Sequence, residues 1–97
     1  MMASFRLEVP DAVAAVIRSL HPDIKRRVRA GLSLVTADPS AGKALKGDLE
    51  GLWSFRIGRL RIVYRAPEGR IVELVAIGPR ATIYAETLRL ARRRGPG

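Results

Sequence analysis

The spacing of the apolar residues changes along this chain, and the change limits which folds it can adopt. Across residues 11–37 apolar side chains recur every three or four residues, which is the spacing of helices with one buried face. After residue 52 they alternate with polar side chains, as they do along half-buried strands. A run of helices followed by a run of strands predicts an α+β domain in which the helices pack against a sheet.

Residues 11–37 are predicted to form a helical hairpin. The first helix begins at Asp11, a suitable N-cap or first-turn acid, directly after Pro10. Its apolar stripe consists of Val13, Val16, Ile17 and Leu20. The second helix runs from about Pro22 to residue 37, because proline is favoured at the first position of a helix, and His21 is then a turn or cap residue. Its inner face consists of Ile24, Val28, Leu32 and Val35.

Four segments are predicted to be strands. The first is residues 5–9, which alternate and end at Pro10. The other three are residues 53–57, 60–64 and 71–77. Gly58-Arg59 and Pro67-Glu68-Gly69 supply turns between these three, so they should form an antiparallel meander. Residues 38–51 are predicted to be loop, since they contain two glycines after residue 42 and show no clear period.

The last helix is expected over residues 81–94, and residues 92–97 should form a basic tail. The predicted order is β-α-α-β-β-β-α in one domain spanning residues 1–97. In this arrangement the N-terminal helical hairpin packs on one face of a mostly antiparallel four-stranded sheet. The other face of the sheet is expected to contact water.

The charge of the chain favours an anionic partner. Eighteen Lys and Arg against nine Asp and Glu give a formal net charge of +9, which attracts nucleic acid or an acidic protein. Most of these cations are arginines, whose planar donors match phosphate oxygens, although a GC-rich genome explains any single arginine equally well. The chain has no cysteine and no metal-ligand pattern, so no metal and no cofactor are expected. With no apolar run long enough to cross a bilayer, a cytoplasmic protein is expected.

Strand alternation predicts a basic sheet face. If the apolar residues point toward the helices, the residues that point outward are Ser54, Arg56, Arg59, Arg61 and Arg65. Neighbouring like charges in a sheet are destabilising, so this cluster calls for an anionic ligand or for counter-charges such as Glu73. A solvated basic face without a ligand explains the spacing about as well.

Arg80 and Tyr84 are the best candidates for chemistry. They lie about one helical turn apart at the start of the last helix, so a guanidinium and a phenol can converge at the sheet edge, where we expect both to be exposed. Cleavage of a phosphodiester needs cationic donors on the phosphate and a group that moves a proton near the 2′-hydroxyl. The alternative for Tyr84 is a helix residue that packs its ring on the core.

Four motifs resemble those of the RelE/ParE superfamily of toxins from bacterial and archaeal toxin-antitoxin pairs. They are Leu45-Lys46-Gly47, the segment Trp53 to Gly58, Arg61-Ile62-Val63-Tyr64, and Gly78 with Arg80 and Tyr84. The resemblance implies a RelE-like, microbial RNase-like fold and a cognate antitoxin that binds the toxin, giving a hetero-oligomer. RelE-type members cut mRNA in the ribosomal A site, with the 2′-hydroxyl as nucleophile and a 2′,3′-cyclic phosphate as product. ParE-type members inhibit DNA gyrase instead.

The resemblance also implies roles for individual residues. Arg61 matches the arginine that holds the scissile phosphate, Arg80 the one that assists the leaving group, and Tyr84 the proposed base. Arg56 stands where RelE-type members have a basic residue. Lys43 and Lys46 match a basic loop that contacts RNA, and Arg59 and Arg65 join them as RNA-binding candidates through the strand alternation above.

Ser54 departs from the RelE pattern, because the most active RelE-type members have lysine there. Despite this departure, the resemblance implies an endoribonuclease toxin acting on ribosome-bound mRNA, with catalytic residues Arg56, Arg61, Arg80 and Tyr84. Two alternatives remain open: a non-enzymatic inhibitor of DNA gyrase, and a degenerate member that only binds its antitoxin.

Overall fold

The fold is the predicted α+β class. The computed structural model describes residues 5–67 and 69–94, and residues 95–97 of the predicted basic tail lie outside this part. The elements in chain order are β1 (Arg6–Glu8), α1 (Asp11–Arg18), α2 (Pro22–Ala37), η1 (Pro39–Ala41), β2 (Lys43–Ala44), η2 (Gly47–Leu49), β3 (Trp53–Ile57), β4 (Leu60–Arg65), β5 (Ile71–Pro79) and α3 (Arg80–Arg94). Within the described residues, no helix is both long and apolar enough to cross a membrane.

One sheet contains five strands in the order β1-β5-β4-β3-β2. The predicted meander of β3, β4 and β5 is confirmed, and β1 runs parallel to β5. The predicted count of four strands was one too low, because β2 lies in the segment expected to be loop. Its two residues, Lys43 and Ala44, pair with Ser54 and Trp53 of β3. A strand of two residues is too short to show a period.

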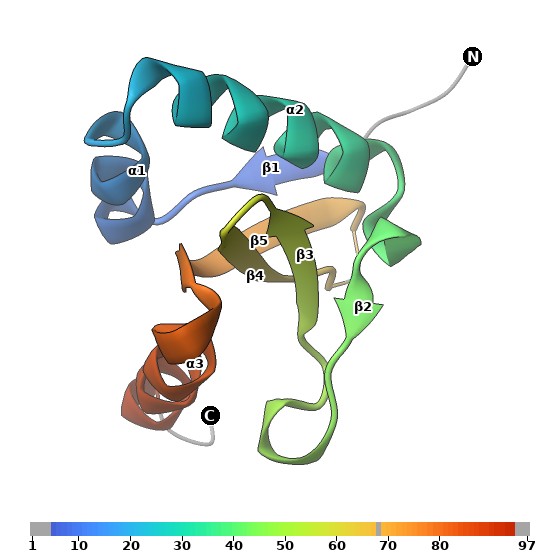
Figure 1. Ribbon diagram of the computed structural model, residues 1–97. Coiled ribbons are helices and arrows are strands. Elements are labelled where there is room, and N and C mark those ends of the chain that lie inside the picture. Colours follow the sequence, from blue (N-terminus) through green and yellow to red (C-terminus); the bar gives the residue numbers. More distant parts are fainter. Residues whose placement is uncertain (1–4, 68, 95–97) are drawn as a thin grey trace.

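Helices cover both faces of the sheet, so the expectation of one solvated face was wrong. The hairpin of α1 and α2 lies across one face, and α3 packs on the other (Figure 1). Ile83 of α3 packs there with Val63 of β4 and Ala76 of β5. The candidate site lies on this α3 side of the sheet, at Arg56 of β3 and Arg61 of β4.

A β-bulge explains how β5 serves both layers. Val63 and Tyr64 of β4 pair with Ala76 and Leu74, so Val75 is an extra residue without a partner. Val75 and Ala76 both pack toward α3, whereas Leu74 packs toward α1 and α2. A bulge shifts the alternation by one residue, which is why residues 74–77 of this strand are all apolar in the sequence.

The α2 helix has the predicted bounds, and its cap is local. Nδ1 of His21 accepts a hydrogen bond from the Asp23 amide at 3.1 Å, which confirms His21 as a cap residue. Val28 and Val35 are fully buried against the sheet. Val16 and Ile24, predicted for the apolar stripes, are instead 43% and 39% exposed, because both belong to the helical turns next to the bend of the hairpin.

A buried tyrosine fixes the loop that leads into β2. The Tyr64 ring is fully buried and stacks on Trp53 with ring centroids 6.5 Å apart. Its hydroxyl donates a hydrogen bond to the Pro39 carbonyl and accepts one from the Gly42 amide at 3.1 Å. Burial raises the pKa of the Tyr64 phenol, the Gly42 N–H lowers it, and the Asp38 carboxylate raises it further. These bonds determine where the chain enters β2.

Candidate functional site

Two arginines face each other on the side of the sheet that α3 partly covers. Arg56 of β3 and Arg61 of β4 are directly opposite partners in the antiparallel pairing, which places their Cβ atoms about 4.5–5.5 Å apart. Arg56 is exposed and Arg61 is partly buried. Nε of Arg56 donates a hydrogen bond to the Gly58 carbonyl at 3.2 Å, and among the described side chains no carboxylate pairs with either arginine. An anion bound between them would relieve their repulsion.

Ser54 lies on the same face, two residues before Arg56, but it does not face solvent as predicted. Only 3% of it is exposed, because α3 covers it. Its Oγ lies 3.2 Å from the phenol oxygen of Tyr84, and either hydroxyl can donate the hydrogen bond. A buried serine with one good partner satisfies its hydrogen-bonding need without a charge.

Tyr84 is half-buried rather than exposed as expected. Its ring packs with Ile83 and Val63, while its hydroxyl meets Ser54 on the sheet. The ring therefore belongs to a core cluster, as in the second interpretation from the sequence, and the phenol oxygen lies against Ser54, two residues before Arg56. Arg80 is the first residue of α3 and so precedes Tyr84 by one turn, but its side chain lies outside the described part of the structure.

Space beside Arg61 comes from a glycine. Gly78 of β5 is its partner on the side away from Arg56. A Cβ atom at Gly78 would lie 3.5 Å from Cδ1 of Ile83, which is an ordinary van der Waals contact, so a small gap separates the strand from this side chain of α3. Because Gly78 has no side chain, β5 places no side chain directly beside Arg61 at this position of the register.

Two lysines lie on the β2 side of the arginines. Lys43 pairs with Ser54 in the sheet and is exposed. Lys46 is also exposed and precedes η2, in the loop between β2 and β3 that contacts α3. The predicted basic loop therefore borders the same face of the sheet as the arginine pair.

The other two RNA-binding candidates lie at opposite ends of β4. Arg59 is exposed in the two-residue turn between β3 and β4, close to Arg56 and Arg61. Arg65 lies four residues beyond Arg61, about 13 Å along the strand. Its Nε is 2.5 Å from Oε1 of Glu73, so Glu73 is the counter-charge for this arginine and not for the pair.

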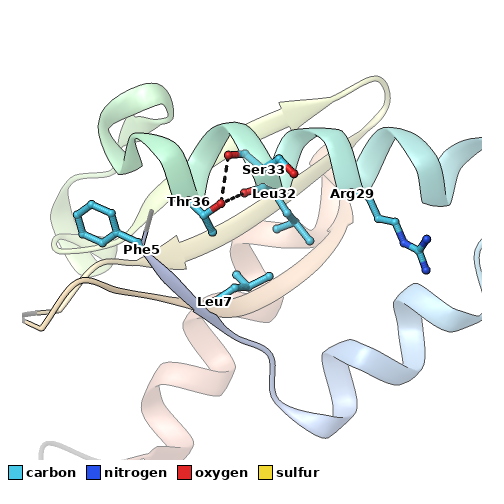
Figure 2. Close-up of a pocket in the computed structure, with 6 residues that line it drawn as sticks. All are labelled: Phe5, Leu7, Arg29, Leu32, Ser33 and Thr36. Carbon is cyan, nitrogen blue, oxygen red and sulfur yellow. Dashed lines mark hydrogen bonds between the residues drawn. The ribbon is translucent and has the colours of Figure 1, made fainter. Parts of the chain in front are cut away.

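A separate hollow of about 380 Å³ lies between β1 and α2 (Figure 2). It is lined by Phe5, Leu7, Arg29, Leu32, Ser33 and Thr36. Its walls are mainly apolar, and it lies on the α1–α2 side of the sheet, away from Ser54 and Tyr84. In the sequence, the alternation of Phe5 and Leu7 predicted only a strand and did not indicate this cavity. In the part of the chain that the structure describes, no group of His, Asp or Glu side chains is close enough to hold a metal ion.

Solved structures of RelE toxins share this fold. The free E. coli toxin RelE, an arginine-substituted mutant, matches 96% of this chain over 99% of its own with a TM-score of 0.74 and 18% identity. The toxin-antitoxin complex RelBE2 of Mycobacterium tuberculosis gives 0.71 and 24% identity over 84% of this chain and 97% of that chain. The archaeal RelE-RelB complex of Pyrococcus horikoshii gives 0.66 and 20% identity over 80% and 97%. The chain therefore has a RelE-like fold.

A family model assigns the chain more closely. The model for the ParE toxin of type II toxin-antitoxin systems, parDE, matches residues 11–84, which span α1 to the Tyr84 turn of α3. The chain belongs to this family and is a toxin of the RelE/ParE superfamily. No curated protein sequence matches it.

Proposed function

We propose that the protein is a ribosome-dependent endoribonuclease that cleaves mRNA in the ribosomal A site and so inhibits translation. The observation that carries the proposal is the Arg56–Arg61 pair, which has no carboxylate partner among the described side chains and shares a sheet face with Ser54, the partner of the Tyr84 hydroxyl. Two guanidinium groups held together in this way suit a phosphate that gains charge during a reaction.

The reaction is attack by the 2′-hydroxyl on the adjacent phosphorus. A bond forms from O2′ to phosphorus and the bond from phosphorus to O5′ breaks, leaving a 2′,3′-cyclic phosphate and a free 5′-hydroxyl. Arg61 and Arg56 stabilise the charge on the non-bridging oxygens. The phenol oxygen of Tyr84 takes the 2′-hydroxyl proton, and Arg80 at the start of α3 assists the departing O5′, which takes a proton from the solvent to give the 5′-hydroxyl.

The four other basic residues predicted to bind RNA contact its backbone in this proposal. Lys43 and Lys46 on the β2 side, and Arg59 in the β3–β4 turn, are exposed and border the arginine pair. Arg65 is the most distant of the proposed contacts, and Glu73 shares its guanidinium. Such contacts position a strand without reading its sequence.

We further propose that a cognate antitoxin binds this toxin in a hetero-oligomeric complex in the cytoplasm. Similar structures from Mycobacterium tuberculosis, Pyrococcus horikoshii and E. coli are complexes of RelE with RelB antitoxins. A short reading frame next to this gene, encoding a DNA-binding half and an amphipathic tail, would support the assignment. Purification of the two proteins as one complex tests it directly.

Toeprinting on programmed ribosomes tests the catalytic proposal. The wild-type protein, Arg61→Ala, Arg80→Ala and the control Arg29→Ala are compared on one mRNA. The expected result is an A-site cut with the wild type and with Arg29→Ala, because Arg29 borders the hollow on the far side of the sheet. No cut should appear with the other two. Cleavage by Arg61→Ala at the wild-type rate overturns the role of the pair.

The match to the ParE toxin model favours one alternative function, inhibition of DNA gyrase by protein contact. A supercoiling assay with purified gyrase distinguishes it. Loss of supercoiling without any ribosomal cut replaces the ribonuclease proposal with the gyrase one. Inactivity in both assays leaves antitoxin binding as the remaining role.

A further inference from the structure

A third guanidinium approaches the arginine pair from the opposite layer of the fold. Nη1 of Arg27, on α2, lies 3.6 Å from the position that a Cβ atom on Gly58 would occupy. Arg56, on the other face of the sheet, donates its Nε hydrogen to the carbonyl of the same glycine. Two arginines from different layers therefore meet at Gly58, at the tip of the β3–β4 turn.

The sequence explains why α2 reaches this turn. Gly31 is buried where α2 crosses β3, and a Cβ atom there would lie only 2.8 Å from Cδ1 of Ile57. The missing side chain allows the helix to approach the strand closely. Arg27 precedes Gly31 by one turn and so lies on the same side of α2. Its Nη1 reaches Gly58, whose φ of +58° is a backbone conformation that favours glycine in the turn.

The charges at this tip are not balanced. Arg59 is exposed in the same turn, next to Gly58. Among the side chains that the structure describes, no carboxylate forms an ion pair with Arg27, Arg56 or Arg59, whereas Arg26, on the same helix, binds Asp23. Positively charged side chains therefore follow one another from Arg61 and Arg56 to the β3–β4 turn and then to α2. A continuous row of guanidinium groups fits a polymer of phosphates better than a single small anion.

We propose that Arg27 and Arg59 form a second phosphate-binding site, which holds the RNA strand beyond the phosphate bound at Arg56 and Arg61. The site rests on the proposed function, because RNA is the strand that the arginine pair binds. Arg27 is not a catalytic residue in this scheme. It extends the binding surface around the β3–β4 turn and so adds one backbone contact.

Binding of a 2′-O-methyl RNA oligonucleotide, which lacks the nucleophile and is not cleaved, tests the site. Fluorescence anisotropy of the labelled oligonucleotide gives the affinity of the full-length protein at several salt concentrations. Arg27→Ala is compared with Arg29→Ala, which removes the same charge from the same helix but on the side of the β1 hollow (Figure 2). Each lost phosphate contact should reduce the slope of log affinity against log salt by about 0.7.

The expected result is a reduced slope and weaker binding for Arg27→Ala and for Arg59→Ala, and wild-type values for Arg29→Ala. Equal behaviour of Arg27→Ala and Arg29→Ala, with the wild type binding well, overturns this site and leaves the proposed function intact. Absence of wild-type binding at every salt concentration also overturns this site, and cleavage on programmed ribosomes tests the proposed function separately. Weakened antitoxin binding by Arg27→Ala, with RNA binding unchanged, would assign the residue to a protein contact and also overturn the site.

Discussion

The hydroxyl groups of Ser54 and Tyr84 lie 3.2 Å apart and join the first half of β3 to the second turn of α3. Ser54 is two residues from Arg56 on the same strand, so this bond sets the distance from the phenol to the arginine pair. A lysine at this buried position would bring a charge beneath α3, where a serine needs only its hydroxyl partner. At Ser54, where the RelE pattern has a lysine, this chain therefore has a neutral side chain whose hydrogen bond positions Tyr84.

Removing each of these two hydroxyl groups in turn distinguishes the positioning of Tyr84 from its part in the cleavage reaction. Ser54→Ala and Tyr84→Phe each delete the same hydrogen bond, so each should lower the free energy of unfolding by about 1 kcal/mol. Tyr84→Phe should abolish cleavage, because it removes the oxygen that accepts the proton, whereas Ser54→Ala should only slow it. Urea denaturation and single-turnover cleavage on programmed ribosomes measure the two effects. Cleavage by Tyr84→Phe at the wild-type rate would rule out the proton-transfer role.

Thr87→Val provides the matched control for these variants. Thr87 is fully buried in α3, and its hydroxyl donates to the Ile83 carbonyl at 2.7 Å. Its loss should lower stability by a similar amount without slowing cleavage. If cleavage falls equally in Thr87→Val, the effect of Ser54→Ala comes from a loosened helix and not from the position of Tyr84.

Arg61→Ala should abolish growth inhibition without destabilising the protein. Two like charges directly opposite in a sheet repel each other, so removing one leaves stability unchanged or raises it by about 0.2–1 kcal/mol. Thermal denaturation of the purified variant, beside an assay of growth after induction, checks both halves of the prediction. A fall in stability greater than about 1 kcal/mol would mean that Arg61 supports the fold, and the loss of toxicity would then say nothing about phosphate binding.

The Tyr64 phenol should make stability depend on pH in alkaline solution. Burial raises its pKa in the folded state above the unfolded value of about 10, so the folded protein holds this proton more tightly. The contribution of Tyr64 is complete below pH 10 and is lost as the pH rises through the raised value. Urea denaturation between pH 8 and about 11 should show a steeper decline for the wild type than for Tyr64→Phe. Parallel curves would contradict the assignment.

The local sequence patterns correctly predicted those helices and strands whose bounds depend on neighbouring residues in the chain. The bounds of α2 and β3 follow from Pro22 and from strict alternation, and the common face of Arg56 and Arg61 follows from the same alternation across a two-residue turn. The alternation along a strand does not continue past a β-bulge. Because Val75 is the extra residue of the bulge in β5, the alternation did not predict the core cluster between the sheet and α3.

The burial of Ser54 was also unpredictable from its neighbours. Its cover comes from Tyr84, thirty residues later in the chain, and only tertiary packing brings the two together. The strand β2 likewise depends on distant residues, because Tyr64 holds the loop before it and β3 supplies its pairing. Side chains that meet through long-range packing leave no local period in a sequence.

Gly42→Ala should disrupt this loop and with it the position of Lys43. A Cβ atom at Gly42 would collide with the Tyr64 hydroxyl and lie 2.8 Å from the Ser54 carbonyl oxygen, which belongs to the backbone of β3 and cannot move aside. We expect a loss of about 2 kcal/mol in the free energy of unfolding, as for an overpacked core. Gly78→Ala is the control, since its Cβ atom would meet only Ile83 at an ordinary 3.5 Å and should leave stability nearly unchanged. Chemical denaturation of both variants decides the matter: equal stability would show that the Tyr64 hydrogen bonds do not fix the entry into β2.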